Sequence, residues 1–264
     1  MKNITIIAFF SLLFAGCEKT IELDYKANQS QIIIEGNISN GPGPYFVKIS
    51  KSIGLSDLGD YPTVDNAAVA ISDDAGKSET LVFEGNGVYR TTSITGVEGR
   101  TYTLTVEAEG QTYTAQSTMP QQVPFDSIKV EEVELLGGTE YNIIPIYLDP
   151  IAKGNNYRFE LSINGEIVKQ HLIQSDEIRN GVANTLRLEL NDDDLALNAG
   201  DTITLMMQCI DENVASFYTA LILMEDNGPG GGTTPSNPPN NITGNGALGI
   251  FSAYTTQTKT AIIQ

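Results

Sequence analysis

Short segments of β-type sequence, separated by turn signals at intervals of roughly 8 to 15 residues, constrain the fold of this chain more than any other feature. Residues 100–119 form the clearest pair, because a turn at Glu109-Gly110 places Val106 opposite Tyr113 and keeps the apolar residues on one face. Closely spaced short strands are typical of antiparallel sandwiches, whereas a parallel sheet needs a crossover helix between its strands. The pattern therefore predicts a mainly β fold.

A second hairpin is predicted over residues 156–173, where Asn164-Gly165 is a type I′ turn signal. Pairing across this turn places Arg158 opposite His171, the only histidine of the chain, on the polar face of the sheet. A neighbouring cation disfavours the charged form of a histidine. We therefore interpret His171 as a surface residue, with a catalytic role as the alternative.

One segment, residues 211–227, departs from the β pattern and predicts a helix. Its apolar side chains follow the spacing of a buried helical stripe, at Val214, Phe217, Tyr218, Leu221 and Ile222. Asp211 is a suitable N-cap, and the Gly/Pro-rich stretch at 228–241 predicts a loop that ends the helix. We expect a core helix packed on a sandwich, with a partner-binding helix as the alternative.

Two prolines at positions 120 and 124 mark a predicted domain boundary. We predict an immunoglobulin-like β-sandwich at residues 31–120 and a second β-sandwich domain at residues 125–264, which carries the one α-helix. The last segment, residues 247–264, is apolar on both faces, as expected of a strand that is covered on both sides. We expect it to pack between the helix and the second sheet, so that its deletion unfolds the second domain alone.

The N-terminus indicates export and lipidation. A lysine precedes an apolar run at residues 4–16, which is long enough for a signal-peptide core but shorter than the roughly 20 residues of a membrane span. Small residues directly before Cys17 are typical of a bacterial lipobox, in which the chain is cut before the cysteine and acyl chains are attached to it. We predict a lipoprotein signal peptide at 1–16, lipidation at Cys17 and a polar tether at 17–30, with an ordinary secretory peptide as the alternative.

Acidic residues outnumber basic ones by 33 to 15. Such a surface repels nucleic acid and anionic headgroups, so we expect no nucleic-acid partner and membrane contact only through the lipid on Cys17. If Cys17 is acylated, Cys209 has no intrachain disulfide partner. Its place in an alternating apolar strand predicts a buried, unreactive thiol.

The sequence lacks the motifs of common active sites, including the serine-hydrolase elbow, the P-loop and histidine-rich zinc sites. We therefore predict no enzymatic activity, catalytic residues, cofactor or metal site, with a carboxylate-based hydrolase as an alternative class. The cluster Asn191-Asp192-Asp193-Asp194, with Asn198 and Asp201, offers oxygen ligands of the kind that Ca²⁺ prefers, but its spacing does not fit an EF-hand loop. We interpret this cluster as a solvated turn.

Several segments carry a resemblance to a known family. They are Cys17-Glu18-Lys19, Ile33 to Ile38, Pro124 to Ile128, the helix before the Gly/Pro-rich loop, Pro239 to Ile242, Gly244 to Gly249, and Phe251 to Tyr254. Together they resemble the Bacteroidetes outer-membrane lipoprotein family catalogued as domain of unknown function 4249 (DUF4249), over nearly all of the mature chain.

The resemblance implies a lipoprotein without established enzymatic activity, anchored at the periplasmic or cell-surface face of the outer membrane. Because such proteins are often encoded beside TonB-dependent receptors, it also implies an accessory role in uptake. We expect the protein to bind a ligand or to dock on a TonB-dependent transporter. A structural or adhesive envelope lipoprotein is the alternative, and a hydrolase is a third class.

Overall fold

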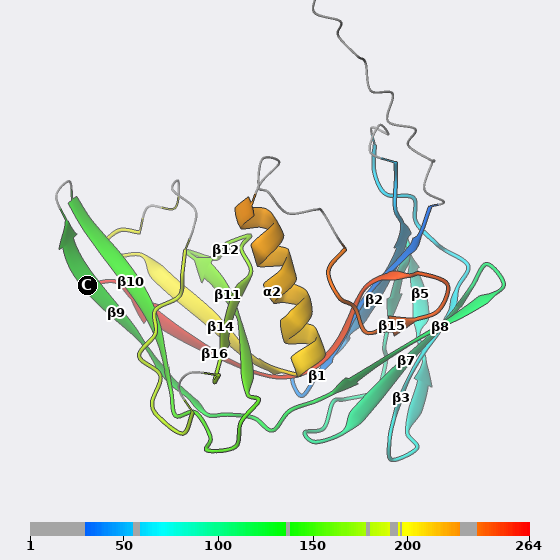
Figure 1. Ribbon diagram of the computed structural model, residues 1–264, viewed down its shortest axis with the longest axis horizontal. Coiled ribbons are helices and arrows are strands. Elements are labelled where there is room, and N and C mark those ends of the chain that lie inside the picture. Colours follow the sequence, from blue (N-terminus) through cyan, green and yellow to red (C-terminus); the bar gives the residue numbers. More distant parts are fainter. Residues whose placement is uncertain are drawn as a thin grey trace, which may run out of the picture.

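The computed structural model describes residues 30–264, apart from 55–58, 136–137, 178–179, 191–194, 196 and 228–236. Outside the described residues lie the signal peptide predicted at 1–16, Cys17, nearly all of the tether at 17–30, Asp192–Asp194 and most of the loop at 228–241. Figure 1 shows two lobes of β-strands with a helix between them. The mainly β content, the sandwich-like layers and the single helix in this part of the chain confirm the predicted fold class.

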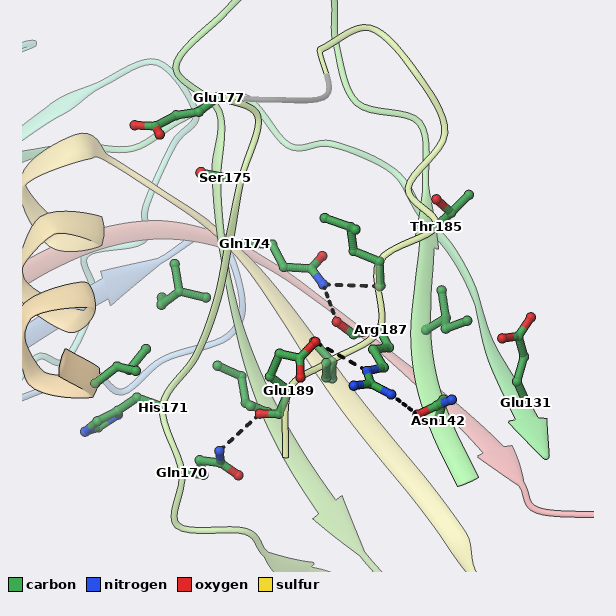
Figure 2. Close-up of a pocket in the computed structure, with 16 residues that line it drawn as sticks. Glu131, Asn142, Gln170, His171, Gln174, Ser175, Glu177, Thr185, Arg187 and Glu189 are labelled. Atoms are coloured by element: carbon green, nitrogen blue, oxygen red, sulfur yellow. Dashed lines mark hydrogen bonds and ion pairs between the residues drawn. The ribbon is translucent and has the colours of Figure 1, made fainter. Parts of the chain in front are cut away.

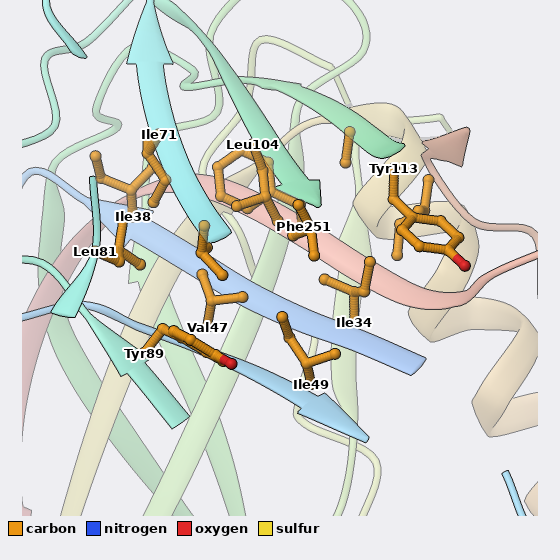
Figure 3. Packing of buried hydrophobic residues seen from close by; sticks show 14 of the residues in the cluster. Ile34, Ile38, Val47, Ile49, Ile71, Leu81, Tyr89, Leu104, Tyr113 and Phe251 are labelled. Carbon is orange, nitrogen blue, oxygen red and sulfur yellow. The ribbon is translucent and has the colours of Figure 1, made fainter. Parts of the chain in front are cut away.

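The N-terminal lobe is built from two sheets that face each other. One contains β1 (Ile32–Ser39), β2 (Phe46–Lys51), β5 (Val82–Gly85) and β6 (Val88–Arg90). The other contains β3 (Ala68–Asp73), β4 (Ser78–Thr80), β7 (Thr101–Ala108), β8 (Gln111–Thr118) and β15 (Ile242–Thr243), in the order β15-β8-β7-β3-β4. Apolar side chains from both sheets form one core, among them Ile38, Val47, Leu104 and Phe251 (Figure 3).

The hairpin β7–β8 has the predicted register. Val106 pairs with Tyr113, and both side chains are buried. Glu109 and Gly110 have φ values of 51° and 75°, as a type I′ turn requires at its two central positions. Turn chemistry and side-chain alternation therefore agree on which face of this sheet enters the core.

The C-terminal lobe packs a long hairpin against a second group of strands. The hairpin consists of β9 (Phe125–Leu135) and β10 (Gly138–Tyr147), and the facing strands are β11 (Asn156–Ile163), β12 (Glu166–Ile167), β13 (Leu172–Ser175) and β14 (Thr202–Ile210). Alternate residues of β11, such as Tyr157 and Phe159, are buried in a core with Ile143 of β10 and Leu205 of β14. The residues between them in β11 face the other side of the sheet, where the helix lies.

The turn predicted at Asn164-Gly165 is confirmed, since both residues have positive φ values of 51° and 88°. The pairing predicted beyond the turn is wrong by two residues, because Arg158 pairs with Ile173 rather than with His171. The register changes because the chain leaves the ladder between β12 and β13, where the connection holds two extra residues. A shift of two residues preserves the faces, so His171 stays on the side of Arg158.

Strand β16 (Leu248–Ile262) joins the lobes. Its first half pairs in parallel with β1, and its second half pairs antiparallel with β14. As a result one sheet runs through both lobes in the order β12-β11-β14-β16-β1-β2-β6-β5, with β13 beside β11. Ile250 packs toward the helix and Phe251 toward the N-terminal core, which confirms a strand covered on both sides.

The expectation that residues 247–264 pack only against the second lobe is wrong. Ala247, Phe251 and Ala253 belong to the N-terminal core. Gly249 has a φ of 108° and lies so close to β1 that a Cβ there would collide with the carbonyl oxygen of Ile34. Both lobes share this last strand. The domain boundary at residues 120–125 stays a prediction.

Helix α2 (Glu212–Asn227) confirms the predicted helix. Asp211 is its N-cap, since Oδ1 accepts a hydrogen bond from the N–H of Val214 at 2.9 Å. The other oxygen of Asp211 accepts hydrogen bonds from the Ser117 hydroxyl and the Thr118 N–H, so the cap also ties the helix to β8. No helix among the described residues is long and apolar enough to cross a bilayer.

Candidate functional site

An open groove of about 960 Å³ lies in the C-terminal lobe, between β13 and residues 185–189 (Figure 2). This volume is near the upper end of the roughly 300 to 1,000 Å³ found for ligand pockets. The walls carry charged and amide side chains, including Glu131, Asn142 and Arg187, together with apolar ones such as Ile222 of α2. The groove therefore offers both polar and apolar contacts to a bound molecule.

The first wall of the groove is the free edge of β13. Asp176 N–H donates to the carbonyl of Asn155 on the β11 side at 3.1 Å, and Gln174 pairs with Tyr157. In an antiparallel ladder, hydrogen-bonded pairs alternate with pairs that are not hydrogen-bonded. The backbone groups of residues 172, 174 and 176 therefore point to β11, and those of Ile173 and Ser175 point into the groove.

The opposite wall is the edge of residues 185–189. On its far side this segment pairs with β10, because Leu188 N–H donates to Ile143 O and Asn184 N–H donates to Tyr147 O, both at 2.8 Å. Because Leu188 N–H points to β10, the N–H groups of its neighbours Arg187 and Glu189 point to the other side, into the groove. The edge of β13 and this non-strand segment therefore face each other across the cavity.

Two glutamine side chains bridge these edges. The Gln174 amide donates to the carbonyls of Leu186 and Arg187, both at 3.2 Å, and the Gln170 amide donates to the carbonyl of Glu189 at 3.1 Å (Figure 2). The two edges are joined by side-chain amides at points where adjacent strands would use backbone N–H groups. The sheet is therefore incomplete along this line.

The charged groups at the groove are unequal in number. Glu131, Glu177 and Glu189 line it beside a single guanidinium, that of Arg187. Arg187 is already engaged, because Nε lies 3.3 Å from Glu189 and Nη1 donates to the Asn142 amide oxygen at 3.2 Å. Glu131 is paired with Lys129, so among the described lining residues Glu177 is the carboxylate without an ion pair, and it favours a cationic group in the groove.

Two buried carboxylates near the C-terminal end of β13 accept hydrogen bonds from loops rather than facing the groove. Asp149 accepts hydrogen bonds from the Tyr157 hydroxyl and the Gly181 N–H, and Asp176 accepts one from the Gly154 N–H. The cavity beside them measures about 10 Å³, which is near the space of one water molecule. Burial and the Asp149 carboxylate raise the pKa of Tyr157, so this phenol stays a hydrogen-bond donor.

A second polar cluster attaches the helix to the outer face of the sheet. Arg158 Nη1 donates to Glu160 at 2.6 Å and to the Gln208 amide oxygen at 2.9 Å, and its guanidinium carbon lies 4.7 Å from the centre of the Tyr218 ring. Burial raises the pKa of Tyr218, which opposes the lowering effect of the Arg158 charge. These contacts hold α2 on β11 through a cation–π interaction.

His171 lies at the border between this cluster and the groove. Its ring centre is 5.2 Å from that of Tyr218, and Nε2 is 3.9 Å from a Glu225 oxygen. Burial lowers the pKa of His171; Arg158 lowers it further, and Glu225 partly opposes both. The predicted influence of the nearby cation has the right sign, but desolvation is the larger cause.

The other residues singled out in the sequence lie apart from the groove. Asp201 accepts hydrogen bonds from the Asn164 amide at 2.9 Å and the Asn198 N–H at 2.7 Å, which lower its pKa and close a turn. Cys209 is free and buried, as predicted, and burial raises its pKa. Among the described residues, no group of three or more His, Cys, Asp or Glu side chains could hold a metal ion.

The bridging glutamines were not among the residues singled out from the sequence. Gln174 did carry a signal, because it occupies a position of β13 whose alternation points to the core and is buried there. A polar residue at such a position needs hydrogen-bond partners. Gln170 precedes the strand and carried no comparable signal.

The family described as Domain of unknown function (DUF4249) matches residues 18–260. This match spans most of the chain, so the protein belongs to that family, and the predicted family resemblance is confirmed. The comparison with curated proteins gave no match. Lipidation, an outer-membrane location and a Bacteroidetes origin remain predictions.

Proposed function

We propose that this protein is a lipid-anchored accessory protein of the outer membrane that uses its C-terminal groove to dock on a TonB-dependent transporter or to bind that transporter's ligand. The apolar run at 4–16 and the small residues before Cys17 support the anchor. The excess of acidic residues supports attachment through lipid rather than through a basic surface. The transporter as partner follows from the family resemblance.

The groove between β13 and residues 185–189 is the observation that supports a binding role most directly. It combines a volume of about 960 Å³, a mixed polar and apolar lining and two edges of backbone groups. Pockets with these properties are common binding sites. We propose that its role is binding without catalysis.

The carboxylates Asp149 and Asp176 line one small cavity, and their environment favours a structural role over hydrolysis. Both are buried, and both accept hydrogen bonds that fix neighbouring loops. A cavity of about 10 Å³ beside them has no room for a sugar ring.

Site-specific crosslinking in intact cells tests the docking role. A photoreactive residue in place of Glu189, at the groove, should crosslink to an outer-membrane transporter. The matched control replaces Val82, an exposed residue of β5 in the other lobe, and should give no such product. Equal crosslinking from both positions, or no crosslinked barrel from Glu189, would count against the proposal.

The anchor is tested separately by Cys17→Ser. We expect this variant to lose membrane association on cell fractionation, because the acyl chains are the only predicted anchor. Normal maturation and membrane retention of the variant would show that another feature holds the protein there.

A further inference from the structure

The two edges of the groove carry backbone donors that no neighbouring strand uses. Within the part of the chain that the structure describes, the N–H groups of Ile173, Ser175, Arg187 and Glu189 have no hydrogen-bond partner. The direction of the first two follows from the ladder with β11, and that of Arg187 and Glu189 follows from the bond of the intervening Leu188 N–H to β10. Exposed donors and acceptors of this kind are a template for pairing with another chain.

The bridging glutamines indicate how such a chain would fit. The carbonyls of Arg187 and Glu189 accept hydrogen bonds from the side-chain amides of Gln174 and Gln170. In a complete sheet, backbone N–H groups would take these positions. An inserted strand can therefore replace the glutamine amides at these carbonyls and pair with Ile173 and Ser175 on its other edge.

We propose that this groove binds an extended peptide segment of a partner protein by strand addition, completing the C-terminal sheet between β13 and residues 185–189. The inference rests on the proposed binding role and names the chemistry of the occupant. About five residues of partner chain match the five-residue edge at roughly 3.3 Å per residue. Main-chain hydrogen bonds supply affinity in this mode of recognition, and side chains at alternate positions supply specificity.

The occupant is a basic strand. Glu131, Glu177 and Glu189 lie along the groove; Lys129 pairs with Glu131 and Arg187 pairs with Glu189, which leaves the charge of Glu177 to be met. A Lys or Arg of the peptide would meet Glu177. Other positions would face apolar lining such as Ile144 and Ile222, which favours β-branched residues.

A displayed library of random eight-residue peptides, selected on the detergent-solubilised full chain, tests the inference. We expect selected peptides to combine at least one Lys or Arg with Val, Ile or Thr. Ser175→Pro removes one edge N–H without touching the β11 ladder and should weaken binding of the selected peptides at least tenfold. Ser175→Ala keeps the N–H and is the matched control, with unchanged affinity expected.

Hydrogen exchange on the unmodified protein gives a second measurement that does not depend on folding of the proline variant. A bound peptide should slow exchange at Ile173 and Ser175, and leave Leu172 and Gln174, which already bond to β11, unchanged. Absence of enriched peptides, equal affinity of the proline and alanine variants, or protection outside these edges would overturn the inference. Peptide binding without a transporter crosslink at Glu189 would instead overturn only the proposed partner.

Discussion

The two lobes bury similar apolar cores but end their sheets differently. In the N-terminal lobe the outer strands are short, with three residues in β4, four in β5 and two in β15, and short edges resist pairing with other chains. In the C-terminal lobe two edges face each other across a groove and are joined by glutamine side chains. A core can therefore be closed by side chains while backbone groups at its edge stay without a paired strand.

Strand β16 limits how independent the two lobes are. It pairs with β1 from Leu248 to Tyr254 and with β14 from Thr255 to Ile262. A change in the N-terminal core can therefore reach the open lobe through this one strand.

Phe251→Ala tests the coupling with the largest expected effect. The side chain is fully buried in the N-terminal core, so its loss should lower the free energy of unfolding by about 3 to 5 kcal/mol. Urea denaturation measures this loss. Maleimide labelling of the buried Cys209 reports opening of the C-terminal lobe, and it should become faster in the variant.

Ile262→Ala is the control, because this residue of the same strand is 62% exposed and should change the stability little. Slow labelling of Cys209 in a destabilised Phe251→Ala protein would show that the lobes unfold separately. That outcome would favour the predicted boundary at residues 120–125.

The sequence predicts the parts of this fold that depend on local chemistry. The turns at Glu109-Gly110 and Asn164-Gly165 and the helix at 211–227 follow from turn propensities and side-chain periodicity within a few residues. The parallel pairing of β16 with β1 could not be predicted in this way. It joins distant segments, and the alternation of apolar residues in β16 says only that both faces are covered.

The candidate site was less predictable than the fold. His171 keeps its predicted face, although its pairing partner shifts by two residues in the connection before β13. The groove depends on the separation of β13 from residues 185–189, and no local pattern encodes a distance between two edges. A polar residue at the core-facing position of Gln174 indicates that it needs hydrogen-bond partners, but only the structure identifies them.

Asp211→Ala tests the second link between the lobes. This carboxylate caps α2 through Val214 and accepts hydrogen bonds from Ser117 and Thr118 of β8. Loss of the cap and of these partners should lower the free energy of unfolding by about 2 kcal/mol. Asp211→Asn keeps a capping oxygen and should lose less in the same denaturation experiment. Equal loss in both variants would show that the negative charge matters more than the cap.

Glu79→Gln tests an acid-sensitive contact of the N-terminal lobe. Burial raises the pKa of Glu79, but hydrogen bonds from Thr92, Ser93 and Ile94 outweigh it and lower the pKa from 4.5 to about 2. A lowered folded-state pKa stabilises the protein above pH 4.5, and this contribution is lost as the pH falls toward 2. The variant should therefore be less stable than wild type at pH 7, with the difference shrinking below pH 4.5 in urea melts. A difference that does not change with pH would contradict this role.

His171→Gln tests the smallest effect, in the open lobe. Burial and Arg158 lower the pKa of His171 below its ordinary 6.5, so the unfolded chain binds a proton more readily than the folded one. The stabilisation is present above pH 6.5 and is lost as the pH falls through the folded-state pKa, the reverse direction to a histidine that gains a carboxylate partner. Between pH 7.5 and 5.5 wild type should lose more stability than the glutamine variant, while Glu79 stays ionised in this range. Parallel pH profiles for the two proteins would show that Glu225 compensates fully for burial, and the acid response of the two lobes would then rest on carboxylates alone.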